Sequence, residues 1–243
     1  DWQNALSSYD ISISNPSSSI DAGKSISGIL SSLRGLGYNN TAQSVITGLP
    51  KATVRNSSDV QEQIFESAWR TGIWDLVQSA SSSQVGFNQS LFKCLKSLVE
   101  GNSSQFWKLH EASKLDVIRN IMKGTDIFAN LAKLQMTSEV VDVWKLRWGN
   151  TSPDDSTLFK MPNTPSIDII EKLVGGKGTK LEEHSFHYIE PLLALRSVLL
   201  KIVGRNDLIP RHMCSIASMA RKEKQYSLAT NIIHGLSFAS NRS

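Results

Sequence analysis

The apolar run from 192 to 203 constrains the fold more than any other stretch of the sequence. Its two charged residues are Arg196 and Lys201. A membrane span needs about 20 mostly apolar residues, so this run is too short and too charged to cross a bilayer. Its leucines recur at the three- and four-residue spacing of a helix. Pro191 suits the first turn of that helix and Gly204 its end. We predict a helix over 191–203, apolar on nearly every side and buried by its neighbours.

The rest of the chain repeats this helical spacing, and no segment shows the sustained alternation of a strand. The spacing predicts helices over 1–9, 20–36, 40–49, 60–70, 74–79, 88–99, 103–112, 114–123, 127–135, 138–147, 167–174, 210–221 and 226–238. Prolines and small polar residues favour a loop over 148–166, and glycines favour a flexible connection over 175–180.

Two distant segments share the pattern of a helical hairpin. Ala68 stands six residues before Trp74, and Ala220 stands six residues before Tyr226, with a polar turn between each pair. In tetratricopeptide-type repeats a small residue lets the two helices approach, and an aromatic residue fills the gap. Residues 136–138 resemble a third, degenerate hairpin turn. Because such hairpins bury their faces only by stacking, we predict an all-α fold, an α-solenoid of antiparallel helical hairpins with Trp74 and Tyr226 as buried plugs.

Composition excludes some classes of protein. The 243 residues are 40% apolar, which permits a sizeable core, and the net charge is only +4. Two cysteines indicate a reducing compartment rather than a disulfide scaffold. Six N-x-Ser/Thr sequences could mark glycosylation, but the abundance of serine makes chance matches the preferred interpretation. These sequences begin at Asn39, Asn56, Asn88, Asn102, Asn150 and Asn241.

Candidate chemical sites are few and incomplete. Residues 175–180, Gly-Gly-Lys-Gly-Thr-Lys, lack the spacing of a phosphate-binding loop. Two pairs of possible metal ligands, His184 with His187 and His212 with Cys214, each lack the second pair of ligands that a zinc site requires. For the basic cluster of Arg211, Arg221, Lys222 and Lys224, a solvated helix face is favoured over a phosphate site. For Cys94, a core position is favoured over a nucleophile. The neighbouring carboxylates Asp154 and Asp155 have no partner acid, and a solvated loop is favoured for them. We therefore expect no catalytic residue, cofactor or metal in this chain.

Several motifs occur in the order found in one known family. They are Trp2-x-x-Ala5-Leu6-x-x-Tyr9-Asp10, Ala68-Trp69-Arg70 with Trp74-Asp75, Leu131-x-x-Leu134-Gln135, Ser138-Glu139, and Glu190-Pro191-x-x-Ala194-Leu195-Arg196-x-Val198. The chain resembles part of the FAT domain of the phosphatidylinositol-3-kinase-related protein kinases, in particular the ATM type. Its richness in serine and asparagine would suit a fungal member of that family.

The resemblance implies a domain organisation and a structural role. Residues 1–149 and 185–243 would be helical repeats of the FAT domain. Residues 150–184 would be a polar loop or insertion with a short helix, and the kinase domain would lie outside this chain, which would begin and end inside a longer polypeptide. The expected structural packing residues are Trp2, Ala68, Trp69, Trp74, Pro191, Leu195, Arg196, Leu199, Ala220, Tyr226 and Ala229. An arginine among leucines, Arg196 should reach an acidic partner or extend to solvent.

The resemblance also implies the activity of the whole protein. The FAT domain would clasp the kinase domain and help to form a homodimer, without contact to nucleic acid or membrane. The kinase domain would bind ATP and magnesium and phosphorylate Ser or Thr before Gln, a pair that this chain contains at Ser83 and Ser104. The protein would act in the nucleus at DNA double-strand breaks and telomeres, recruited by a break-sensing nuclease complex. Two alternatives remain: another kinase of the same class, or a free-standing tetratricopeptide-type adaptor that binds a protein partner.

Overall fold

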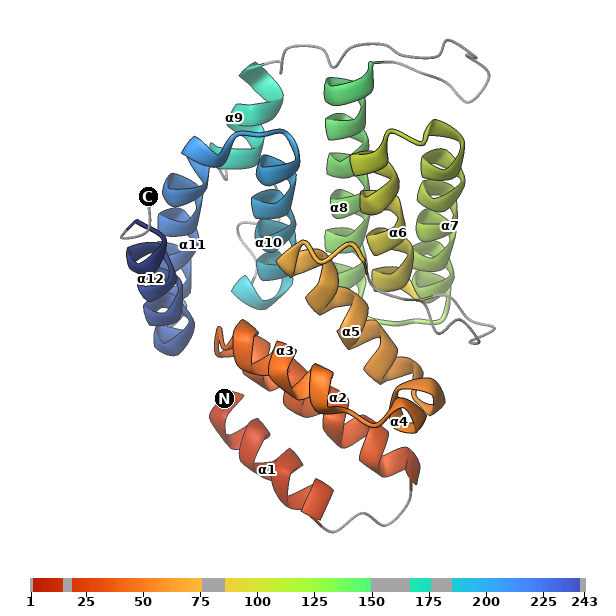
Figure 1. The fold of residues 1–243 in the computed structure, drawn as a ribbon, viewed down its shortest axis with the longest axis vertical. Helices are drawn as coiled ribbons and strands as arrows, with labels where there is room; N and C mark the ends of the chain where they lie inside the picture. Colours follow the sequence, from red (N-terminus) through yellow and green to blue (C-terminus); the bar gives the residue numbers. More distant parts are fainter. Residues whose placement is uncertain (1, 15–18, 76–85, 150–166, 176–184, 241–243) are drawn as a thin grey trace. The chain divides into compact units, whose positions relative to one another are not determined.

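A computed structural model describes residues 2–14, 19–75, 86–149, 167–175 and 185–240, and every regular element in these ranges is a helix (Figure 1). The chain divides into two compact units. Unit 1 comprises Asp1–Gln89 and Ala220–Ser243, and unit 2 comprises Ser90–Met219. The prediction of an all-α fold is confirmed, and within each unit neighbouring helices of the sequence pack on each other, as stacked hairpins require.

Six of the described helices belong to unit 1. These are α1 (Trp2–Ser14), α2 (Ser19–Gly35), α3 (Asn39–Gly48), α4 (Lys51–Asn56), α5 (Ser58–Thr71) and α12 (Tyr226–Ser240). Helix α2 packs against α1, α3 and α5. Glycine allows the closest of these contacts. A Cβ added at Gly35 would lie 2.5 Å from the ring of Trp2, and one at Gly28 would lie 2.5 Å from the ring of Tyr9. The two aromatic residues of the first motif therefore anchor α1 on α2.

The last helix of unit 1 contacts the turn between α2 and α3. The side-chain amide of Asn231 donates to the carbonyl oxygen of Leu36 at 2.7 Å, which satisfies an acceptor just beyond the end of α2. Gly37 forms this turn with a φ of +84°, and a Cβ at that position would lie 3.1 Å from Asn231 and from Leu228. Two segments nearly 200 residues apart in the sequence are thus joined by a hydrogen bond and close packing.

Unit 2 is organised around the longest described helix. Its elements are α6 (Phe87–Glu100, which begins in unit 1), α7 (Ser103–Met122), α8 (Ile127–Trp148), α9 (Ile167–Gly175), α10 (Phe186–Ile202), the 3₁₀ turn η2 (Asn206–Leu208) and α11 (Ile209–Lys222, which ends in unit 1). Helix α8 packs against α7, α9 and α10. At its end, the indole of Trp148 donates to the carbonyl oxygen of Leu98 in α6 at 2.9 Å.

Two predicted helix breaks in unit 2 are wrong. Helix α7 continues through 113, and α8 continues through the residues interpreted as a degenerate hairpin turn. Met136 and Thr137 are buried inside α8, where the Thr137 hydroxyl donates to the carbonyl oxygen of Leu134 at 2.8 Å. Neither position contains the Gly or Pro that ends a helix, so the continuous ladder of backbone hydrogen bonds persists.

The start of α10 also differs from its prediction. Pro191 lies inside the helix, which begins five residues earlier at Phe186. The preceding turn buries Phe186 and Ile189. We attribute the earlier start to this apolar burial, which offsets the single backbone hydrogen bond that proline removes.

The plug prediction for Tyr226 is wrong. Its side chain is 62% exposed, whereas Ala220, Leu228 and Ala229 are buried beside the turn. Lys224 adopts a positive φ of 59° in that turn, and the Gln225 amide donates to the Ala220 carbonyl oxygen at 2.8 Å. Leu228 and Ala229, rather than Tyr226, are thus the buried side chains in the first turn of α12.

Other expectations are only partly within the described residues. Trp74 is half-buried and lies after the end of α5, and most of the helix predicted over 74–79 lies outside the described ranges. Most of the predicted insertion over 150–184 also lies outside them, except for the short helix α9, which matches the prediction for 167–174. No helix in the described ranges has the length and apolarity to span a membrane.

Candidate functional site

Among the described residues, those considered for catalysis or metal binding do not assemble into a site. In the described ranges, no group of three or more His, Cys, Asp or Glu side chains is placed to hold a metal ion. The Nε2 of His212 donates to the carbonyl oxygen of Leu193 at 2.9 Å, and Cys214 is exposed. Burial raises the pKa of the Cys94 thiol far above its ordinary value, which removes the thiolate a nucleophile needs. His184, Asp154 and Asp155 lie outside the described ranges.

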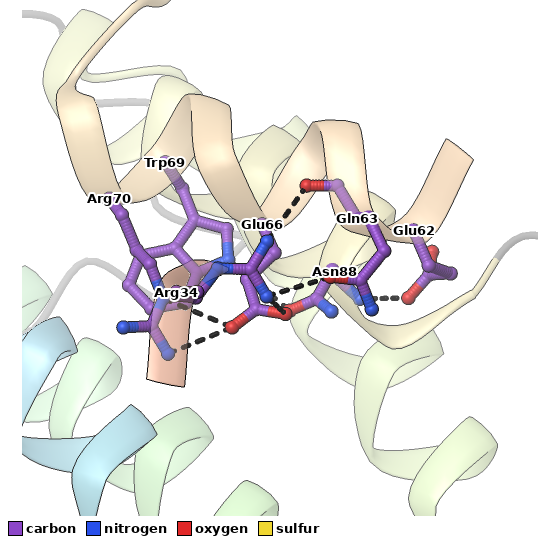
Figure 2. Close-up of polar contacts among 7 residues, drawn as sticks. All are labelled: Arg34, Glu62, Gln63, Glu66, Trp69, Arg70 and Asn88. Atoms are coloured by element: carbon purple, nitrogen blue, oxygen red, sulfur yellow. Dashed lines mark hydrogen bonds and ion pairs between the residues drawn. The ribbon is translucent and has the colours of Figure 1, made fainter. Parts of the chain in front are cut away.

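The most extensive cluster of charged side chains joins α2 to α5, and we call it the α2–α5 network. Glu66 accepts from two arginines: Arg34 at 2.7 Å and Arg70 at 2.8 Å. Arg34 also donates to the side-chain oxygen of Gln63 at 2.8 Å. Figure 2 shows these side chains pointing toward one another. Because Glu66 is largely buried, its interactions with both arginines are less screened than those of a surface pair.

The same face of α5 holds the first turn of α6. Glu62 accepts from the backbone amides of Asn88 at 2.8 Å and Gln89 at 3.2 Å, which satisfies two of the unpaired donors at the start of that helix. The indole of Trp69 donates to the side chain of Asn88 at 3.2 Å (Figure 2). The guanidinium of Arg70 lies 5.1 Å from the centre of the Trp69 ring. Trp69 of the second motif thus joins α5 to α6, while Arg70 of the same motif pairs with Glu66 and lies beside Trp69 within α5.

A second buried ion pair joins α8 to α10. Glu139 and Arg196 are each 1% exposed. The carboxylate accepts from the Nη2 of Arg196 at 2.7 Å and from its Nε at 2.9 Å, with a further bond from Gln135 at 2.9 Å. Of the two outcomes expected for Arg196, the acidic partner is the one found. This geometry places a bidentate, charge-assisted pair at the centre of unit 2.

A buried histidine lies within an aromatic cluster of unit 2. The ring of His110 is parallel to Phe106 at 6.2 Å and perpendicular to Trp107 at 5.9 Å, while Phe106 stacks on Trp144 at 4.1 Å. The Nε2 atom of His110 is buried and has no hydrogen-bond partner among the described residues. Burial, followed by the charge of Lys114, lowers the pKa of His110 to about 4. The imidazole is therefore neutral in the folded protein at neutral pH.

We expect acid to destabilise unit 2 through this histidine. The unfolded chain binds a proton near pH 6.5, whereas the folded chain binds it only near pH 4. Neutral His110 therefore makes its full contribution to the free energy of unfolding above pH 6.5, and this contribution is lost as the pH falls toward 4. Urea unfolding at a series of pH values should show this slope.

A His110→Phe variant should show a shallower slope, while a His234→Gln variant, changed at an exposed histidine, should retain the full slope. Burial also lowers the pKa of His212, so this histidine contributes to the slope that remains in the His110→Phe variant. Equal slopes for the wild type and His110→Phe would contradict the prediction.

The predicted packing residues fall into three groups. Pro191, Trp2 and Trp74 are half-buried, and Tyr226 is exposed. The buried ones are Ala68, Trp69, Leu195, Arg196, Leu199, Ala220 and Ala229. Sequence reasoning missed the roles of Arg34, Glu66 and His110, although a single charged side chain on an otherwise apolar helix face was an available signal at Arg34.

The relatives found among known proteins include two kinases named ATM. No family model matches the chain. It is 28% identical over 204 residues to a serine/threonine-protein kinase ATM of Arabidopsis thaliana, which covers 74% of this chain and 5% of that protein. It is 23% identical over 238 residues to a serine-protein kinase ATM of Sus scrofa, which covers 90% of this chain and 7% of that protein. The chain thus spans only a small part of each relative, and the similarities support its resemblance to an ATM-type segment.

Proposed function

We propose that this chain is a non-catalytic helical scaffold, a FAT domain segment, of a large serine/threonine protein kinase of the ATM type. Similarity to two such kinases, over 74% and 90% of the chain, supports the assignment. The roles of the motif residues support it further. Trp2 anchors α1 on α2, Trp69 joins α5 to α6, and Arg196 joins α10 to α8.

One observation carries the scaffold role: several aromatic and charged motif side chains, among them Trp2, Trp69 and Arg196, contact another helix of the chain. A scaffold must hold helices at fixed distances and registers, and bidentate ion pairs impose both because their geometry is narrow. The ion pair of Arg34 with Glu66 joins α2 to α5, and that of Glu139 with Arg196 joins α8 to α10. A catalytic segment would instead direct such groups into a shared cleft.

The proposal extends to the whole protein. Its kinase domain, beyond this chain, would bind ATP and magnesium and phosphorylate Ser or Thr followed by Gln. The helical segment would clasp that domain and contribute to a homodimer. The protein would act in the nucleus, at double-strand breaks and telomeres, recruited by a break-sensing nuclease complex.

A substitution in the α2–α5 network of the full-length protein tests the scaffold role. Glu66→Gln leaves two buried arginines facing a neutral amide, so we expect a lower melting temperature and several-fold lower phosphorylation of a Ser-Gln peptide. The KM for ATP of the remaining folded enzyme should be unchanged. Glu100→Gln, which alters an exposed pair with Lys96, is the matched control.

Two results would count against the scaffold. One is a selective loss of ATP affinity in Glu66→Gln without loss of stability. The other is full activity in a Glu66→Gln protein whose melting temperature has clearly fallen.

A further inference from the structure

Helix α7 is apolar on two opposite faces, and only one of them is covered by the described residues of unit 2. The inner face buries Phe106, His110, Ser113 and Val117. On the other side, Leu115, Ile118 and Met122 are 53%, 46% and 82% exposed, and we call these three residues the α7 outer face. Figure 1 shows α7 at the edge of its unit. Large exposed apolar side chains gathered on one helix face, rather than scattered singly, mark interaction surfaces.

The α7 outer face is flanked by positive charge. At 100° per residue, Lys108, Arg119 and Lys123 lie along one side of the apolar residues and Lys114 lies on the other. All four cations are exposed, and none has an ion-pair partner in the described part of the chain. The acids of the helix do not balance them, since they are only two: Glu111, and Asp116, which accepts from the Asn120 amide.

The C-terminal end of this surface is followed by a defined turn. At the C-terminal end of α7, Gly124 adopts a φ of +74°, and the amide of Thr125 donates to the Asn120 carbonyl oxygen at 3.2 Å. Asp126 then caps α8 by accepting from the amide of Phe128 at 2.9 Å. The apolar residues are therefore presented on a preformed helix, which lowers the entropy lost on binding.

We propose that the α7 outer face docks an acidic amphipathic helix of a partner protein. Apolar residues at intervals of three and four on the partner would contact Leu115, Ile118 and Met122, in the manner of other helix-recognition surfaces. Carboxylates on both flanks of the partner helix would pair with Lys114 on one side and with Lys108, Arg119 and Lys123 on the other. The flexible side chain of Met122 adapts to the shape of its contact.

Charge decides against two other occupants. A second copy of the chain, related by twofold symmetry, would bring the same four cations against each other. An anionic membrane is disfavoured because Glu111, one turn before Leu115, lies in line with the apolar residues and would be repelled by acidic lipid headgroups. An acidic helix can place its carboxylates beside the four cations and leave the position that faces Glu111 without charge.

The test uses the full-length protein and a fluorescent peptide of about 18 residues, five helical turns. The acidic probe has leucines on one face and glutamates on both flanks. A second probe has the same composition in scrambled order, and a third has lysine in place of glutamate. We expect fluorescence anisotropy to show saturable binding of the acidic probe alone, weakened as salt is raised.

Three variants locate the binding surface. Leu115→Ser with Met122→Ser should weaken binding of the acidic probe by about tenfold or more, and Arg119→Glu with Lys123→Glu should weaken it and abolish its salt dependence. Ile127→Ser changes an exposed apolar residue outside the α7 outer face and should leave binding unchanged. Circular dichroism should show equal helix content in all three, because every substituted residue is exposed.

Other outcomes would overturn the proposal. One is that the scrambled probe binds as tightly as the acidic probe, and another is that the acidic probe does not bind. A third is that Ile127→Ser weakens binding as much as Leu115→Ser with Met122→Ser does. Tighter binding of phosphatidylserine vesicles that displace the acidic probe would assign the surface to a membrane. Self-association that Met122→Ser abolishes would assign it to a second copy.

Discussion

Replacing Glu139 by alanine is expected to lower the free energy of unfolding of unit 2 by about 3–5 kcal/mol. The substitution leaves the guanidinium of Arg196 buried at 1% exposure without its carboxylate, and it also removes the acceptor of Gln135. The cost of desolvating a buried charge is offset only by a partner held in good geometry. Removing one partner therefore lowers the free energy of unfolding more than replacing both by apolar side chains. Urea unfolding followed by tryptophan fluorescence would measure the effect, since Trp144 lies in the same helix.

A double variant separates the charge from the packing. Glu139→Met with Arg196→Leu fills the same space with apolar side chains, and we expect it to recover most of the stability lost in Glu139→Ala. A double variant as unstable as the single one would show that this position depends on the ion pair itself. A wild-type value for Glu139→Ala would contradict the buried geometry.

Replacing Leu199 by aspartate is the second large effect. Leu199 is fully buried in α10, and a carboxylate there would lose its hydration without gaining a partner, a loss of several kcal/mol. In the full-length protein this change should lower both abundance and phosphorylation of Ser-Gln peptides. The affinity of the surviving folded molecules for ATP should be unchanged, because the proposed scaffold does not form the nucleotide site.

Lys201→Asp is the matched control for Leu199→Asp. It introduces the same carboxylate two residues away on the exposed side of α10, so abundance and activity should remain near the wild-type values. Equal losses in the two variants would mean that charge, rather than burial, is responsible. Normal folding of Leu199→Asp would contradict the central position of α10.

Local patterns predicted the helices well where apolar residues line one face. Helices α5 and α11 match their predicted ranges closely because each has a single buried face. Helix α7 was divided in two because Leu115, Ile118 and Met122 interrupt the spacing of its inner face. They belong to the same helix but lie on its other side. Periodicity cannot distinguish a break from a second apolar face without knowledge of what each face contacts.

The polar contacts were the least predictable part. The sequence indicated that Arg196 needs an acidic partner, but Glu139 lies 57 residues away, and no local rule selects it among the other acids. Glu66, by contrast, stands four residues before Arg70, a spacing that predicts their contact on one helix face. Its second partner, Arg34, comes from another helix and required the tertiary structure.

The hydrogen bond from Asn231 to Leu36 has a consequence for the nascent chain. Unit 1 needs residues from both ends of the sequence, so its assembly must wait until the ribosome has made the whole of 90–219. At about 5–20 residues per second this delay is on the order of 10 s, longer than the microseconds to milliseconds in which helical units collapse and fold. Unit 2, although it starts later, can therefore finish first. During that interval the carbonyl oxygen of Leu36 remains without Asn231, and the surface that will receive α12 is open to ribosome-associated chaperones.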